Sequence, residues 1–108
     1  MSGYLLIESR DPFESKGFAQ HCELALTLLG EGNSVTLFLV ENAVLAARAA
    51  AKARDLDKLA KAGVRVLADK FALHERGIDA RQVIAAVEPA ELNALLAHLA
   101  DGAKTLWN

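Results

Sequence analysis

Three short apolar runs constrain the fold of this chain more than any other feature. They are Tyr4–Ile7, Val35–Val40 and Val64–Ala68, and none of them alternates regularly between apolar and polar residues. Such runs are typical of strands that are buried on both faces, whereas a half-exposed strand alternates. We therefore expect three strands that lie inside a sheet with helices on both sides.

The segment between the first two runs predicts a long helix. Its core-facing stripe follows the spacing of an amphipathic helix and consists of Phe18, Cys22, Ala25, Leu26 and Leu29. Ser15 is the expected N-cap, and Gly30 with Gly32 is expected to end the helix. Leu24 and Leu28, beside His21, form a second apolar stripe. Because the helix would then carry apolar side chains on more than one face, we expect a neighbouring helix or another subunit to cover the second stripe.

The segment between the second and third runs is rich in alanine. Asn42 is a candidate N-cap for a helix over Ala43–Arg54. Asp55 is expected to cap a second helical piece that ends at Gly63 and turns Leu56, Leu59 and Ala60 inward. A slim helix of this kind can approach a sheet or a partner subunit closely.

After the third run, Phe71–Arg76 predicts a short helix closed by Gly77, and Asp79 is a candidate cap for a further turn. Val83–Val87 fits either a short strand or a helical turn. Glu88 and Pro89 are expected to open the last helix, with a stripe of Leu92, Leu95, Leu96 and Leu99. Ala103–Trp107 is expected to form a final short strand.

Alternating strands and helices predict an α/β fold. We expect a single domain over residues 1–108, with three αβα layers and a mostly parallel five-stranded sheet. A chain of 108 residues is long enough for one core, and 53% hydrophobic with 24% charged residues indicates a globular protein.

Composition also excludes several classes of function. The net charge of −2 leaves no basic footprint for nucleic acid, and no apolar run approaches the roughly 20 residues that span a membrane. The only cysteine, Cys22, cannot form an internal disulfide, which favours a reducing, cytoplasmic location. No phosphate loop and no zinc-type spacing of histidine and cysteine occurs, so we expect neither a cofactor nor a metal.

Polar residues follow each predicted strand at its carboxyl end, where ligands bind in parallel α/β sheets. The predicted ligand-binding residues are Glu8, Ser9, Arg10, Glu41, Asn42, Asp69 and Lys70. Asp69 and His74 lie about one helical turn apart, which makes an acid–base pair possible. Alternatively, Asp69 caps the short helix and His74 faces solvent, as we expect of His98, Glu75 and Arg76. Cys22 fits the core better than it fits a reactive site.

Four segments together resemble the DsrE/DsrF-like family. They are the first strand with Glu8, the run Val35–Val44, the segment Asp69–Ile78 with its Glu-Arg-Gly-Ile ending, and the last strand ending in Leu106-Trp107. The resemblance implies a small flavodoxin-like unit that forms homo- or hetero-oligomers, from dimers to hexamers. It also implies sulfur relay, in which active members carry a persulfide on one cysteine between partner proteins.

The chain departs from that family at the reactive position. In sulfur-carrying members the cysteine lies at the end of the third strand, a place that falls at or beside Asp69 in this sequence. No cysteine lies between Gly63 and Asn108, and a carboxylate cannot hold a transferable sulfur. Three hypotheses follow: a non-catalytic oligomeric module that binds a small molecule or a protein, a sulfur-relay protein using Cys22, and a small enzyme using Asp69 with His74.

Overall fold

The computed structural model describes residues 3–13, 16–48 and 53–108. All five strands of its sheet are parallel and follow the order β4-β3-β2-β1-β5. The strands are β1 (Gly3–Glu8), β2 (Ser34–Leu39), β3 (Arg65–Asp69), β4 (Val87–Ala90) and β5 (Lys104–Trp107). The three apolar runs therefore form the three central strands, and the predicted parallel sheet is confirmed.

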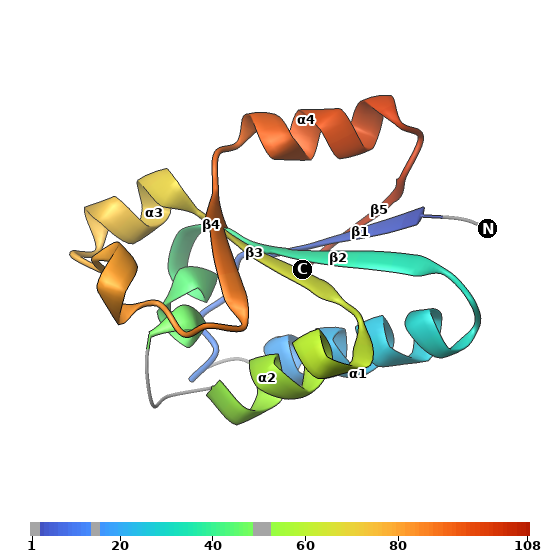
Figure 1. Cartoon of the computed structure of the whole chain (residues 1–108), viewed down its shortest axis with the longest axis horizontal. Helices are drawn as coiled ribbons and strands as arrows, with labels where there is room; N and C mark the ends of the chain where they lie inside the picture. The colour runs from blue at the N-terminus through green and yellow to red at the C-terminus, as the bar shows by residue number, and fades with distance from the viewer. Residues whose placement is uncertain (1–2, 14–15, 49–52) are drawn as a thin grey trace.

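Helices cover both faces of the sheet, as predicted. Figure 1 shows α1 (Lys16–Gly30) and α2 (Ala53–Ala62) on one face and α4 (Asn93–Ala100) alone on the other. Gathered at one end of the sheet are α3 (Lys70–Glu75) and the 3-10 helices η1 (Glu41–Ala47) and η2 (Ala80–Gln82). Within the described ranges, no helix has the length and apolar character that crossing a membrane requires.

Side chains alternate between the two faces along each strand. Leu6, Leu37 and Val66 point into the larger core, which α1, α2 and η1 complete. The smaller core lies under α4 and consists of Leu5, Ile7, Phe38, Val40 and Leu67. Both faces of the central strands are thus buried, which explains why their sequences do not alternate.

The stripe of α1 is rotated slightly from the predicted one. The buried side chains are Phe18, His21, Cys22, Ala25 and Leu28, while Leu26 and Leu29 are partly buried and Leu24 remains at the surface. His21 follows Phe18 by three residues, so a polar residue occupies the core stripe. The prediction assigned Leu28 and His21 to an outer stripe, and that was wrong.

The predicted helix over Ala43–Arg54 was also wrong. The chain forms the 3-10 helix η1, preceded by Val40 as N-cap, and Arg48 then adopts an extended conformation and pairs with Val83. Residues 49–52 lie outside the described residues, as does the predicted cap Ser15. Because α2 begins at Ala53, Asp55 lies in its first turn and not at its cap.

The segment around Pro89 was predicted to begin a helix and instead forms β4. This strand lies at an edge of the sheet and pairs only with β3, and edge strands tolerate a residue that has no N–H. Neither alternative for Val83–Val87 is correct, because Val83 forms an isolated bridge and the strand begins at Val87. The predicted cap Asp79 is confirmed, since its side chain accepts a hydrogen bond from the N–H of Arg81.

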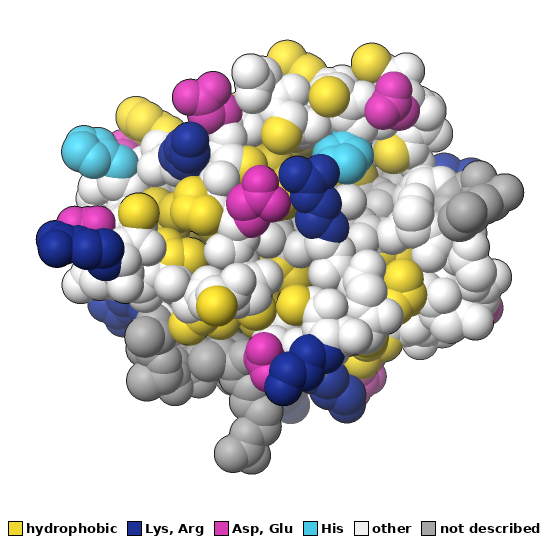
Figure 2. Space-filling view, viewed as in Figure 1, with side chains coloured by type: hydrophobic (Ala, Val, Ile, Leu, Met, Phe, Trp, Pro, Cys, Tyr) yellow, Lys and Arg dark blue, Asp and Glu magenta, His cyan; other side chains and the backbone are white. Residues whose placement is uncertain are grey.

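The leucine stripe of α4 does not face the core as predicted. Leu95 and Ala94 pack against the sheet, whereas Leu92, Leu96 and Leu99 are exposed, Leu96 to 63%. Figure 2 shows hydrophobic side chains over α4 at the top of the molecule. His98, predicted to be solvated, is half-buried. An apolar stripe identifies the face of a helix that avoids water, but it does not identify what covers that face.

Candidate functional site

A cavity of about 300 Å³ lies at the carboxyl end of the sheet. We call it the strand-end pocket. The ends of β2 and β3, the helix α3, the start of α4 and the end of β5 contribute its walls, which consist of Val40, Glu41, Asp69, Phe71, Ala72, Glu75, Arg76, Leu92, Leu95 and Trp107. Of the seven predicted ligand-binding residues, only Glu41 and Asp69 line this pocket.

Asp69 is the last residue of β3 and is only 5% exposed. Its Oδ2 accepts a hydrogen bond of 3.2 Å from the N–H of Ala72, which caps α3. The capping role that the sequence left open for Asp69 is therefore present. By strand alternation its side chain lies on the same face as Leu67, toward α4.

Arg76 forms the outer wall of the strand-end pocket and is not the solvated residue that we predicted. Its Nε and Nη2 donate to Oδ1 of Asn42 at 3.2 and 2.9 Å. Its Nη1 donates to the main-chain oxygen of Ala72 at 3.1 Å. Asn42 therefore holds the arginine that follows α3 in place and does not cap a helix. This interaction ties η1 to α3 at the rim of the pocket.

Glu41 begins η1 in a strained conformation. It is the only non-glycine residue with a positive φ, 50°, in the described part of the chain. Glutamate, unlike glycine or asparagine, rarely adopts a left-handed conformation, and adopting it lowers the stability of the folded protein. Residues strained in this way are often found at functional sites. The turn places an exposed carboxylate at the mouth of the strand-end pocket.

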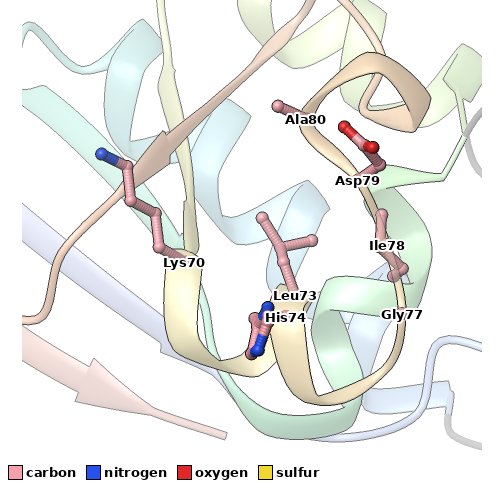
Figure 3. Close-up of a pocket in the computed structure, with 7 residues that line it drawn as sticks. All are labelled: Lys70, Leu73, His74, Gly77, Ile78, Asp79 and Ala80. Carbon is pink, nitrogen blue, oxygen red and sulfur yellow. The ribbon is translucent and has the colours of Figure 1, made fainter.

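Lys70 and His74 belong to a different cavity. This cavity has a volume of about 470 Å³ and lies between α3 and the loop to η2. Figure 3 shows His74 and Leu73 between Lys70 on one side and Asp79 on the other. Asp69 does not line this cavity, and His74 does not line the strand-end pocket. The structure therefore does not bring Asp69 and His74 into one cavity.

The three predicted residues at the end of β1 form a separate polar cluster. Glu8 is fully buried, and its Oε1 lies 3.4 Å from Nδ1 of His21. Asn108 donates from Nδ2 to both carboxylate oxygens of Glu8, at 2.9 and 3.3 Å. The N–H of Arg10 donates to Oε2 at 3.1 Å. This cluster fastens the end of β1 to α1 and to the residue after β5.

Burial raises the pKa of Glu8, but its contacts with His21, Asn108 and the N–H of Arg10 together lower it by more. The net pKa therefore lies below the ordinary value of 4.5, so the cluster favours the ionised carboxylate. The contact with His21 is long for a hydrogen bond. Among the described residues, Nδ1 of His21 has no partner at good hydrogen-bonding geometry.

Sequence reasoning selected Glu8 but missed His21 and Asn108 as its partners. The spacing of His21 from Phe18 and Ala25 could have indicated that His21 faces the sheet. Asn108 follows a predicted strand, but the sequence does not show that β5 lies next to β1. Ser9 also contacts Asn108, because its N–H and Oγ donate to the main-chain oxygen of Asn108 at 2.8 and 3.0 Å.

Cys22 lies in the core stripe of α1 and is buried. It borders a small cavity of about 150 Å³ between α1 and α2, on the opposite face of the sheet from the strand-end pocket. Across residues 3–13, 16–48 and 53–108, no three side chains of His, Cys, Asp or Glu lie close enough together to hold a metal ion.

Comparison with known proteins gives one family and several solved structures. Residues 3–107 match the model of the DsrE/DsrF-like family. No curated protein matches the chain in sequence. Among solved structures, the ychN protein from E. coli superposes with a TM-score of 0.88 at 25% identity, and the match covers 100% of both chains.

Two further structures share the fold at lower identity. A protein of unknown function from Methanobacterium thermoautotrophicum, MTH1491, has a TM-score of 0.83 at 14% identity over 99% of this chain and 98% of its own. BT1422 from Bacteroides thetaiotaomicron, also of unknown function, has a TM-score of 0.83 at 16% identity over 99% and 95%. All three structures support the sheet order and layers described above.

Proposed function

Because the chain belongs to the DsrE/DsrF-like family, we propose that it is a non-catalytic, oligomeric protein that binds a small molecule or a segment of a partner protein in the strand-end pocket. Membership of this family links the chain to sulfur metabolism. The binding role is our inference from the pocket, and a protein of a sulfur relay is the partner that the family suggests.

One observation carries the proposal: a buried aspartate ends β3 beside an apolar cavity. Asp69 uses its carboxylate to cap α3, and a carboxylate cannot accept a persulfide sulfur. The pocket next to it has the features of a small binding site, with mostly apolar walls and a few polar groups at its rim. Its location at the carboxyl ends of parallel strands is the usual one for ligands in α/β sheets.

Binding can be measured with N-phenyl-1-naphthylamine, a neutral dye that brightens in apolar surroundings. Trp107, the only tryptophan, lines the pocket and serves as an energy-transfer donor. We expect saturable binding that Phe71→Ser weakens about five-fold, because an aromatic wall of the pocket is lost. Phe13→Ser is the matched control, since Phe13 is also an exposed phenylalanine but does not line the pocket. The absence of saturable binding, or an equal loss in both variants, would refute the proposal.

The outward side of α4 supports the oligomeric part of the proposal. Leu96 and Leu99 are exposed there on consecutive turns, and such apolar surface commonly marks contact between protein chains. We expect size-exclusion chromatography with light scattering to give a multiple of 11.6 kDa. Leu96→Glu should reduce that mass, whereas Leu24→Glu on α1 should leave it unchanged. A wild-type monomer at micromolar concentration would refute the oligomer.

The alternative that Cys22 relays sulfur has a direct test. We expect mass spectrometry after incubation with a persulfide donor to show no added sulfur on the folded protein, because Cys22 is buried. Sulfur that appears on the wild type and disappears in Cys22→Ser would replace the binding proposal with a relay. Unfolding the protein before incubation supplies the positive control for thiol reactivity.

A further inference from the structure

The strand-end pocket combines two exposed aromatic rings in one small cavity. Aromatic residues make up only 6% of the chain, yet Phe71 and Trp107 both line this pocket while remaining 64% and 65% exposed. Aromatic side chains are usually among the residues that bury the most surface. The rings of Phe71 and Trp107 are therefore exposed at the same cavity, where both can contact a bound ligand.

The charges around the pocket are predominantly negative. Glu41, Asp69 and Glu75 contribute three carboxylates to its lining, against the single guanidinium of Arg76. That guanidinium already donates to Asn42 and Ala72 and lies 3.9 Å from Oε1 of Glu75. The lining thus retains a surplus of negative charge after Arg76 is counted.

Asp69 strengthens this imbalance because it is the most deeply buried of the three carboxylates. Oδ2 accepts from the N–H of Ala72, and no Lys, Arg or His of the described chain lies within ion-pair distance of the carboxylate. Glu8, the other buried carboxylate, has His21 beside it and three hydrogen bonds. A buried carboxylate without a cationic partner is costly, and a bound cation would relieve that cost.

Aromatic faces attract cations, and the attraction increases where water is excluded. Carboxylates at the rim and base of the same cavity add to it and disfavour anions. Resting on the binding function proposed above, we propose that the strand-end pocket recognises a small organic cation, an amine or quaternary ammonium with an apolar body. The volume of about 300 Å³ lies at the lower end of the range for small-molecule sites.

The test compares three ligands that share a benzyl group and differ in charge. Benzyltrimethylammonium, benzyl alcohol and phenylacetate are titrated separately against N-phenyl-1-naphthylamine bound to the wild-type protein, with Trp107 emission as a second readout. We expect the cation to bind about ten-fold more tightly than the alcohol, and phenylacetate to bind most weakly.

Three variants identify the source of that preference. Asp69→Asn keeps the capping oxygen and removes the charge, so it should reduce the affinity for the cation about ten-fold and leave that for benzyl alcohol unchanged. Phe71→Leu keeps an apolar wall without an aromatic face and should reduce cation binding about three-fold. Glu31→Gln removes an exposed carboxylate that does not line the pocket and should change neither affinity.

The outcomes separate this inference from the function on which it rests. If the dye binds but the three benzyl ligands compete equally, or phenylacetate competes best, the cation preference is refuted and the binding function stands. If neither the dye nor any ligand binds to folded protein, the binding function itself fails. An acetylated arginine peptide that competes more tightly than benzyltrimethylammonium would refute the assignment to a small molecule.

Discussion

The two faces of the sheet are covered to very different extents. Among the described residues, 21 buried hydrophobic side chains form the core between the sheet and α1, α2 and η1, against five in the core under α4. The same strands supply both faces, so the difference arises from the helices that cover them. The α4 face is the one that borders the strand-end pocket and the exposed leucines.

The two buried carboxylates repeat this contrast. Glu8 points into the larger core and has His21, Asn108 and the N–H of Arg10 around it. Asp69 points toward the α4 face and accepts one hydrogen bond, from Ala72. On the larger-core face, the chain itself therefore supplies several partners to the buried carboxylate. The other face leaves apolar surface and a carboxylate for contacts outside the chain, as both proposals require.

The largest effect on the free energy of unfolding is expected when each of two adjacent leucines of β1 is shortened to alanine. Leu5 and Leu6 are both fully buried but point to opposite faces. We expect Leu6→Ala to cost about 4 kcal/mol in the free energy of unfolding and Leu5→Ala about 2 kcal/mol, because the thinly covered face can collapse around the cavity more easily. Urea denaturation at submicromolar concentration measures both, and Leu24→Ala serves as a surface control. Costs that agree within about 0.5 kcal/mol would contradict the unequal cover of the faces.

Much of the fold could be predicted because its strands carry an unusual signal. Tyr4–Ile7, Val35–Val40 and Val64–Ala68 are apolar on both faces, and only a covered parallel sheet buries such strands. The glycines that end helices were equally informative: Gly63, with a φ of 118°, closes α2 as predicted.

The predictions failed where tertiary context overrides local preference. The alanine-rich segment has high helix propensity, yet Arg48 leaves the helical conformation to pair with Val83, a residue 35 positions away. Pro89 suits the first turn of a helix as well as an edge strand, and only the sheet order decides between them.

The second prediction neutralises the carboxylate on the well-covered face. Glu8→Gln keeps the shape of the side chain but loses the charge that His21 and Asn108 stabilise, so we expect a cost of about 1 to 3 kcal/mol at pH 7. The pKa of Glu8 is lowered from 4.5 by folding. Its contribution is therefore complete above about pH 4.5 and is lost as the pH falls through the lower folded value. Urea unfolding between pH 3 and 7 should show the variant and the wild type converging at the acid end.

Residues of the candidate site were predictable only by position. The carboxyl ends of parallel strands share one edge of the sheet, and this rule selected Glu41 and Asp69, which line the strand-end pocket. The same rule also selected five residues that do not line it: Glu8, Ser9, Arg10, Asn42 and Lys70. The sequence could not show that Asp69 and His74 face different cavities, since that depends on the direction of α3. It also gave no sign of Trp107, which reaches the pocket from a strand two places away from β2 in the sheet.

The smallest effect is expected from the substitution that neutralises Asp69, the buried carboxylate on the thinly covered α4 face. Asp69→Asn keeps an oxygen that can cap α3 and removes a buried charge without a cationic partner. We therefore expect the free energy of unfolding to stay within about 0.5 kcal/mol of wild type or to rise, the opposite of Glu8→Gln. Asp69→Ala, which also removes the cap, should cost about 1 kcal/mol. If Asp69→Asn destabilises the protein as much as Glu8→Gln, then Asp69 is stabilised within the chain, and the reason for placing a cation beside it disappears.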